Sequence, residues 1–180
     1  LKLEDMGLNS CWLTFTDGAA VSSALGISPF MEVAAIAAFG YGKKVRRELQ
    51  LNVISMSNVD IAVKRHYYDP KKSIQDMVYY ESWGSREGLD EHMGFYGDIL
   101  WDSFYAASQS PSYLNRQPYG FILHGSDVVL VRKPDAYTDD IDARLNLGIV
   151  LLHFSAVASQ LLGKLKWEMG GSDEGLELPA

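Results

Sequence analysis

The stretch that most constrains how this chain can fold is a loop with two prolines, which separates an apolar helix-like run from an apolar strand-like run. The first run covers 99–107 and the second covers 121–123. Pro111 is expected to end the helix, because proline lacks a backbone N–H and restricts the residue before it. The loop over 110–118 offers hydroxyl and amide side chains beside free backbone N–H groups, which suits a planar ligand with polar edges. An ordinary helix–loop–strand connection of the same composition is an equal alternative.

Composition bounds the class of protein. The chain has 180 residues, of which 47% are hydrophobic and 22% are charged, so it suits one soluble globular domain or two small lobes. A formal charge of −7 argues against a nucleic-acid partner, and one cysteine excludes an internal disulfide. No uninterrupted apolar run approaches the roughly 20 residues that a membrane-spanning helix needs. With no secretory signal evident, we expect a cytoplasmic protein without a membrane partner.

Short elements are predicted before residue 70. Gly7 and Gly26 are each expected to end a helix, because glycine readily takes the left-handed cap conformation, and Asp17 is a favourable N-cap. The apolar run before Gly40 fits a helix or a strand by periodicity, and its continuity favours a buried strand. The predicted elements are a helix end over 1–8, a connection over 9–15, a helix over 18–25, a buried strand over 31–39 and a solvated linker over 43–68.

The rest of the chain predicts a second lobe with longer elements. Residues 124–127 indicate a hairpin turn between two apolar strands. The run before Gly163 has apolar residues at helical spacing and is continuous enough to be largely buried. Cys11 and His153 are interpreted as core residues. The predicted elements are an extended arm or strand over 71–80, a turn region over 83–88, a helix over 96–108, strands over 119–123 and 128–131, a helix over 141–162, a last strand over 164–169 and a frayed tail over 170–180.

The loop residues also resemble a known motif. Pro111-Ser112-x-x-Asn115-x-Gln117-Pro118, followed by an aromatic residue, resembles the flavin-contacting loop of the FMN-dependent nitroreductase family. In that family the loop follows a helix and precedes a core strand. Further segments are similar to the same family in the same order: 6–17 with its Gly-Leu and Cys-Trp pairs, 35–42 ending in Gly-Tyr-Gly, the basic and then apolar arm over 71–78, and the helix entry over 142–154.

The last of these segments resembles a branch of the family that holds two nitroreductase halves in one chain. The resemblance implies an α+β, nitroreductase-like fold, with a mixed or antiparallel sheet flanked by helices and with pseudo-dimeric halves. It implies that 1–70 is the C-terminal portion of a first half plus a linker, that 71–180 is a connecting arm and the second half, and that an N-terminal part is missing. The similar helix–Gly–polar–Trp pattern around Trp12 and Trp167 agrees with two related halves.

The resemblance also implies which residues bind FMN. Ser112 and Asn115 would hydrogen-bond the flavin ring or ribityl chain, and the backbone N–H of Thr14 would face flavin N5. Lys72, together with Lys71, would meet the phosphate. No side-chain acid or base is required, and we find no metal-ligand pattern. The predicted cofactor-binding residues are Pro111, Ser112, Tyr113, Asn115 and Gln117 on the loop, Thr14 and Phe15 in the first half, and Lys71 and Lys72 in the arm.

The implied activity is that of an FMN-dependent oxidoreductase. Such an enzyme takes hydride from NAD(P)H and passes electrons to a nitroaromatic, quinone or similar small acceptor by a ping-pong route. One flavin site per chain, shared between two lobes, implies a monomer with an internal pseudo-dimer or a weak homo-oligomer. The alternative is a nitroreductase-fold binding or structural module with weak or no flavin binding. The absence of the family's Arg-rich phosphate anchor and the degenerate turn over 164–167 motivate this alternative.

Overall fold

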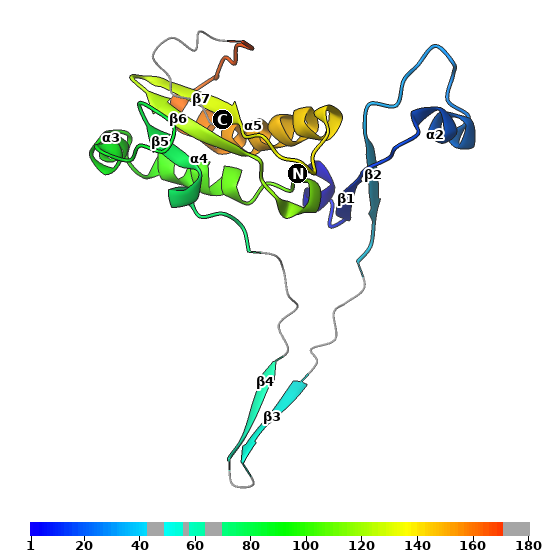
Figure 1. Cartoon of the computed structure of the whole chain (residues 1–180), viewed down its shortest axis with the longest axis horizontal. Helices are drawn as coiled ribbons and strands as arrows, with labels where there is room; N and C mark the ends of the chain where they lie inside the picture. The colour runs from blue at the N-terminus through cyan, green and yellow to red at the C-terminus, as the bar shows by residue number, and fades with distance from the viewer. Residues whose placement is uncertain (43–48, 56–57, 64–69, 171–180) are drawn as a thin grey trace. The chain divides into compact units, whose positions relative to one another are not determined.

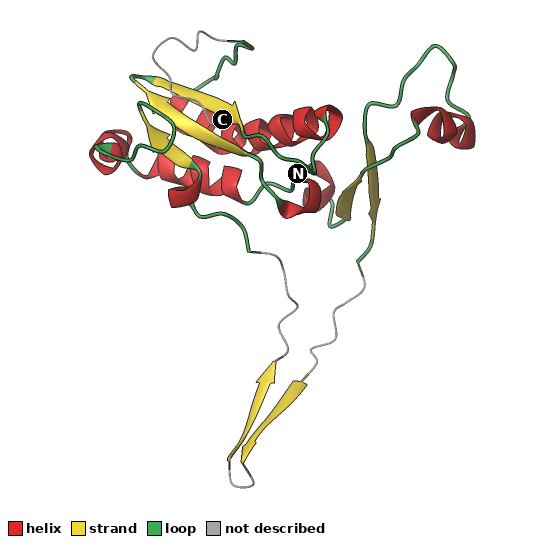
Figure 2. Ribbon diagram, in the orientation of Figure 1, coloured by secondary structure: helices red, strands yellow, loops and turns green. Residues whose placement is uncertain are grey.

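The computed structural model describes residues 1–42, 49–55, 58–63 and 70–170, and it contains both helices and small sheets (Figures 1 and 2). The chain divides into two compact units, Leu1–Asp69 and Pro70–Ala180. The expected α+β class, with small sheets flanked by helices, is confirmed.

The first unit consists of short elements around two antiparallel strand pairs, β1 with β2 and β3 with β4. Asp17 caps α2 as expected, because its carboxylate accepts the backbone N–H of Ala20 at 2.9 Å. Gly26, with φ of 64°, closes that helix. The elements are α1 (Lys2–Asp5), β1 (Asn9–Leu13), α2 (Gly18–Leu25), β2 (Ile36–Gly40), β3 (Leu49–Ser55) and β4 (Asn58–Val63).

Three sequence-based predictions for residues 1–42 are wrong. The expected connection over 9–15 contains strand β1, and the expected buried strand over 31–39 is a strand only from Ile36 and is mostly exposed. Cys11 is exposed on β1, where it was expected in the core. A two-stranded ribbon has few neighbours to cover its faces, so apolar continuity in β2 does not imply burial.

The expected linker over 43–68 contains the antiparallel pair β3–β4, and its other residues lie outside the described part of the chain. Apolar residues alternate with polar ones along these strands, as at Leu51, Val53, Val59, Ile61 and Val63. This period of two is the sequence signal for a strand, and the prediction of a linker missed it.

The second unit contains a three-stranded mixed sheet with the order β5-β6-β7. Strand β5 runs parallel to β6, and β6 forms an antiparallel hairpin with β7, as the turn over 124–127 predicted. The elements are a 3-10 turn (Ile74–Asp76), β5 (Val78–Tyr80), α3 (Leu89–Tyr96), α4 (Asp98–Ser108), a second 3-10 turn (Tyr113–Asn115), β6 (Tyr119–His124), β7 (Asp127–Arg132) and α5 (Asp140–Leu162).

The core of the second unit joins two helices to the sheet (Figure 1). Phe104 of α4, Phe121 of β6 and Phe154 of α5 are almost fully buried and contact one another. Their ring centroids lie 5.1 Å apart for Phe104–Phe121, 5.1 Å for Phe104–Phe154 and 5.5 Å for Phe121–Phe154. Contacts between aromatic rings stabilise the fold beyond the contribution of the area that the rings bury. The cluster therefore fixes α4 and α5 against β6.

Two predictions for the second unit are corrected. The helix expected over 96–108 begins at Asp98, because Gly97 adopts φ of 66° and ψ of −164° and separates α4 from α3. Residues 164–169 form no strand, and Trp167 instead packs edge-on against Phe154 and donates a hydrogen bond to Ser155 Oγ at 2.9 Å. Most of the expected tail, 171–180, lies outside the described residues.

The long helix α5 forms as expected, and its buried side packs against α4. His153 is half-buried on α5 and hydrogen-bonds the carbonyl of Ala106, and burial lowers the pKa of its imidazole. Among the described residues, only the stretch Asp140–Gln160 of α5 is long and apolar enough to cross a membrane. Core helices of water-soluble proteins meet the same criterion, so one such helix is weak evidence for a membrane span.

Candidate functional site

The 110–118 loop connects α4 to β6 and contains an unusual backbone. Leu114, Asn115 and Gln117 have positive φ angles of 48°, 54° and 47°. Residues with a Cβ atom rarely adopt this region, and each such residue costs on the order of 1–3 kcal/mol unless its surroundings favour it. Three of them within four residues therefore require strong anchoring from neighbouring elements.

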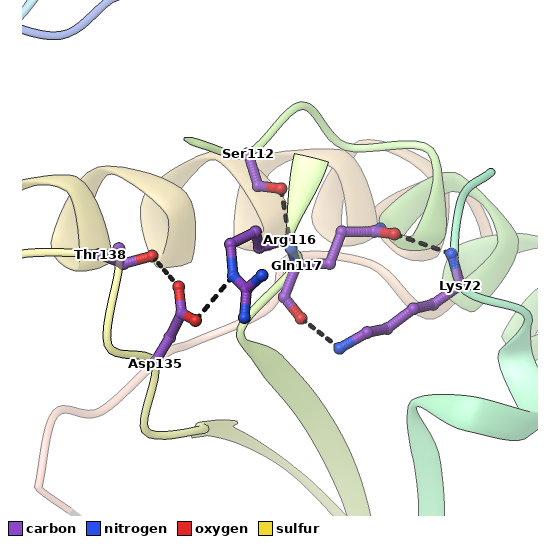
Figure 3. Close-up of polar contacts among 6 residues, drawn as sticks. All are labelled: Lys72, Ser112, Arg116, Gln117, Asp135 and Thr138. Carbon is purple, nitrogen blue, oxygen red and sulfur yellow. Dashed lines mark hydrogen bonds and ion pairs between the residues drawn. The ribbon is translucent and has the colours of Figure 1, made fainter. Parts of the chain in front are cut away.

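Gln117, drawn in Figure 3 with its contacts to Ser112 and Lys72, provides the first anchor. Its side chain has no exposed surface. Its side-chain Oε1 accepts the backbone N–H of Lys72 at 2.8 Å, and its Nε2 donates to the carbonyl of Ser108 at 2.6 Å. Its own backbone N–H donates to Ser112 Oγ at 2.9 Å, which closes the loop on itself. The amide of Gln117 therefore ties the loop to the arm before β5 and to the end of α4.

Two lysines of the arm provide the second anchor. The ammonium of Lys71 donates to the carbonyl of Ser110 at 2.8 Å, and that of Lys72 donates to the carbonyl of Gln117 at 2.7 Å. Burial lowers the pKa of both lysines, and repulsion from Lys133 and Arg116 lowers that of Lys72 further. An ammonium has three N–H donors, so one bond to a carbonyl leaves each lysine able to bind an anion.

Asn146 of α5 provides the third anchor, on the inner side of the loop. Its Oδ1 accepts the backbone N–H of Tyr113 at 3.2 Å, and its side chain is nearly buried. Within the described part of the chain, its Nδ2 has no hydrogen-bond partner. Asn146 is not among the sequence-predicted site residues, although an amide inside a long apolar helix is a visible signal in the sequence.

An ion pair anchors the outer side of the loop (Figure 3). The guanidinium Nε of Arg116 lies 2.7 Å from the Asp135 carboxylate, which also accepts a hydrogen bond from the hydroxyl of Thr138. The hydrogen bond from Thr138 is the largest cause that holds the pKa of Asp135 below its ordinary value, and the hydrogen bond and positive charge of Arg116 lower it further. The guanidinium also lies 4.4 Å from the ring centroid of Tyr137, a cation–π contact. None of these contacts was predicted from the sequence.

The second unit brings together the predicted residues of the loop and of the arm. Asn115 Nδ2 donates to the carbonyl of Pro70 at 3.3 Å, so the loop and the arm also meet there. Thr14 is exposed and Phe15 is half-buried after β1, in the first unit, and the structure places them relative to that unit alone. Pro111 is exposed, Gln117 is buried, and the half-exposed residues are Lys71, Lys72, Ser112, Tyr113 and Asn115.

The arrangement presents a rigid, polar-edged loop beside two partly buried ammonium groups. Ser112 Oγ accepts from Gln117 N–H, which leaves its O–H able to donate a hydrogen bond to a ligand. Lys71 and Lys72 supply positive charge in a chain whose formal charge is −7. In the described ranges, no group of three or more His, Cys, Asp or Glu residues could hold a metal ion. The site therefore suits an organic anion with several hydrogen-bonding groups.

Comparisons with known proteins identify relatives. The model of a protein family described as "Putative TM nitroreductase" matches residues 1–158. The crystal structure of a putative nitroreductase from Thermotoga maritima MSB8 is similar, with a TM-score of 0.54 and 18% sequence identity over 94% of this chain and 55% of that chain. The chain thus spans little more than half of that relative, and the likeness shows a shared fold. No curated protein matched. Because the family model covers most of its length, the chain belongs to the putative TM nitroreductase family.

Proposed function

We propose that the chain is part of an FMN-dependent oxidoreductase of the nitroreductase type, which uses NAD(P)H to reduce nitroaromatic compounds, quinones or similar small acceptors. One observation carries the proposal: the 110–118 loop has the residue order of a flavin-contacting loop and is held in a strained conformation by buried anchors. Strained loops held this way are characteristic of ligand sites. Membership of a nitroreductase family supports the same class of redox chemistry.

The residues present fit an FMN molecule. Ser112 and Asn115 would bind polar groups of the flavin ring or ribityl chain, because each is half-exposed and carries a donor. Lys71 and Lys72 would bind the phosphate with the remaining N–H donors of their ammonium groups. When bound, FMN would supply the hydride and electron transfer, and the protein would orient it. By the resemblance, Thr14 would contribute its backbone N–H and Phe15 would lie beside it.

We further propose that residues 1–70 and 71–180 belong to two nitroreductase-like halves, with one flavin site per chain. This boundary lies next to the division between the two compact units. Such a protein would be a monomer with an internal pseudo-dimer or a weak homo-oligomer in the cytoplasm. Its partners would be NAD(P)H and a small electron acceptor, without nucleic acid or membrane.

A second candidate function is a binding or structural module with weak or no flavin binding. The ammonium groups of Lys71 and Lys72 already donate to loop carbonyls, so a phosphate would have to share them. The side chain of Gln117 is fully buried and satisfied by internal contacts, so its role in a flavin site would be to hold the loop. These contacts would keep the loop ordered even without a cofactor.

A visible absorption spectrum of the purified protein, repeated after addition of FMN and desalting, separates the two functions. The oxidoreductase is expected to retain a flavin band, whereas a folded protein that retains none would favour the module. In a protein that binds FMN, Lys72→Ala is expected to raise the Kd about tenfold, because a charge-assisted hydrogen bond is lost. Lys164→Ala, an exposed site with the same charge change, is the control and is expected to leave the Kd unchanged.

Asn115→Ala tests the loop side of the site by the same titration. Asn115 has φ of 54°, so alanine would both remove the side chain and strain the backbone. Asn115→Gly removes the side chain without straining the backbone, because glycine adopts positive φ angles readily, so it isolates the effect of the lost side-chain contact. Both variants are expected to weaken FMN binding. Unchanged affinity in Asn115→Gly and in Lys72→Ala would contradict the proposed site.

A further inference from the structure

We propose that Asn146 is a positioning residue, which holds the 112–117 segment of the loop in the conformation that a flavin would contact. The identity of the ligand rests on the proposed function, whereas the hold on the loop does not. Asn146 lies on α5, 33 positions from Tyr113 in the sequence, and is not among the cofactor-binding residues that the nitroreductase resemblance implies.

The buried row of α5 on which Asn146 lies is otherwise apolar. Ala143, Val150, Phe154 and Ala158 follow one another at helical spacing and are buried, and Asn146 lies in the same row with 4% of its surface exposed. A side chain that served packing alone would be apolar here, as its neighbours are. The buried Nδ2, without a partner among the described residues, makes the amide costly at this place. A specific contact is therefore needed to explain it.

That contact is with the first residue of the 3-10 turn in the loop. The first N–H groups of a helical turn have no partner inside the turn, and the preceding serine or threonine side chain commonly satisfies one of them. Here the preceding residue, Ser112, makes no such cap, because its Oγ accepts the N–H of Gln117 instead. The Oδ1 of Asn146 takes over the capping and accepts the N–H of Tyr113 at 3.2 Å.

The cap supplied by Asn146 acts where the strained segment begins. Leu114 and Asn115, with positive φ angles, follow directly after Tyr113. Ser112 and Asn115, the two side chains assigned to the flavin, flank the capped residue on either side. If the N–H of Tyr113 is released, the turn can relax toward more common backbone angles, and both side chains change direction. Asn146 thus acts on a ligand through the loop and would not touch it.

Asn146→Leu removes the acceptor while keeping an apolar-compatible shape, and Asn146→Asp keeps an oxygen that can accept the N–H of Tyr113. Gln160→Leu is the matched control, because Gln160 is exposed on α5 and its side chain donates to the carbonyl of Ala156 in the same helix. Two readouts apply: amide hydrogen exchange in the FMN-free protein, and the Kd for FMN.

In Asn146→Leu, the amides of Tyr113 and Gln117 are expected to exchange about tenfold faster, while the urea midpoint stays near that of the wild type. The Kd for FMN is expected to rise about three- to tenfold, and the absorption maxima of the bound flavin to shift. Asn146→Asp is expected to restore slow exchange. Gln160→Leu is expected to change neither readout.

The outcomes separate the inference from the proposed function. Unchanged exchange in Asn146→Leu would overturn the inference, even if FMN binds tightly. Faster exchange in a protein that binds no FMN would support the role of Asn146 in holding the loop and would count against the proposed function. Faster exchange with an unchanged Kd for FMN would overturn the positioning role.

If Asn146→Leu does not fold, the same hydrogen bond can be removed from the side of Tyr113. Ser112 has φ of −145° and ψ of 161°, an extended conformation that suits a residue before proline, and Tyr113 begins the turn, where proline fits. Tyr113→Pro and Tyr113→Ala both remove the ring, but only proline removes the N–H. Faster exchange of the Gln117 amide in Tyr113→Pro than in Tyr113→Ala is expected, and equal rates would overturn the proposal.

Discussion

At the scale of single residues, the loop is held in shape by side chains that form hydrogen bonds with backbone atoms. The amide of Gln117 binds one N–H and one carbonyl, and the ammonium groups of Lys71 and Lys72 each bind a carbonyl. The lysines assigned to a phosphate thus also stabilise the loop that would contact the flavin. A substitution at Lys72 therefore removes a proposed phosphate contact and a hydrogen bond to the loop at the same time.

Asp135 gives a prediction about pH. Because Thr138 and Arg116 hold the pKa of its carboxyl below the ordinary value of 3.8, the folded state favours the carboxylate. The stabilisation is present above the ordinary pKa and is lost as the pH falls through the lowered one. Asp135→Asn is therefore expected to lower the free energy of unfolding by about 0.5–1.5 kcal/mol at pH 7, and by progressively less in acid.

Urea denaturation of wild type and Asp135→Asn, between about pH 2 and pH 7, measures this difference. Asp76 and Asp140 also have lowered pKa values, but they are present in both proteins and cancel in the comparison. Two stability curves that run parallel at all pH values would show that the ionisation of Asp135 does not contribute.

The helix–loop–strand arrangement around residues 110–118 could be predicted from the sequence, because the prolines and the flanking apolar runs indicate it locally. The partners that hold the loop could not. Asn146 lies 33 positions from Tyr113, and Asp135 lies 19 positions from Arg116. Contacts over such separations depend on how α5 and the strands pack, which local patterns do not specify. The buried amide of Asn146 was nonetheless visible as a polar residue at an apolar helical position.

At the scale of elements, Gly120 allows strand β6 to lie close to its neighbours. A Cβ atom at this position would lie 2.7 Å from ring atoms of Trp83 and 3.0 Å from the carbonyl oxygen of Met77. Neither a packed indole nor the backbone can move aside easily. Gly120→Ala is therefore expected to lower the free energy of unfolding by about 1–3 kcal/mol, measured by urea denaturation.

Gly94→Ala is the matched control for this overpacking. Gly94 lies inside α3, and in the described part of the chain no atom beyond its neighbours and the backbone of its own helix lies within 4 Å of the place where its Cβ would be. Alanine is expected to stabilise the helix there by about 0.5–1 kcal/mol, because glycine has greater backbone freedom in the unfolded chain. If both substitutions change stability in the same direction, the close approach at β6 is not what restricts Gly120.

Elements with strong local signals could be predicted from the sequence. The Asp17 cap, the hairpin turn and the apolar period of α5 each depend on residues close together in the chain, and all three form. Strands β1 and β2 could not be bounded, because their edges are set by pairing with each other. Helix α3 was not predicted, and α4 was predicted to begin at residue 96, because a glycine near the start of a helical pattern does not by itself decide where one helix ends and the next begins.

At the scale of the whole molecule, burial is unequally divided. Every residue that the structure describes as buried lies between Met77 and Ala158, in the second unit. In the first unit, none of the residues with a described exposure is buried, and large apolar side chains such as Phe30 and Phe39 are exposed. The sequence predicted the overall class through a family resemblance, whereas this division follows from which elements find packing partners.

This division predicts how the two units behave when separated. A chain of residues 70–180 is expected to unfold in one cooperative transition, with a free energy of unfolding of about 5–10 kcal/mol, because it contains the aromatic core. A chain of residues 1–69 is expected to show no cooperative transition, because isolated two-stranded sheets are at best marginally stable. Urea denaturation followed by far-ultraviolet circular dichroism measures both. A non-cooperative 70–180 chain would mean that its core needs residues outside it, and a cooperative 1–69 chain would mean that the first unit buries a core of its own.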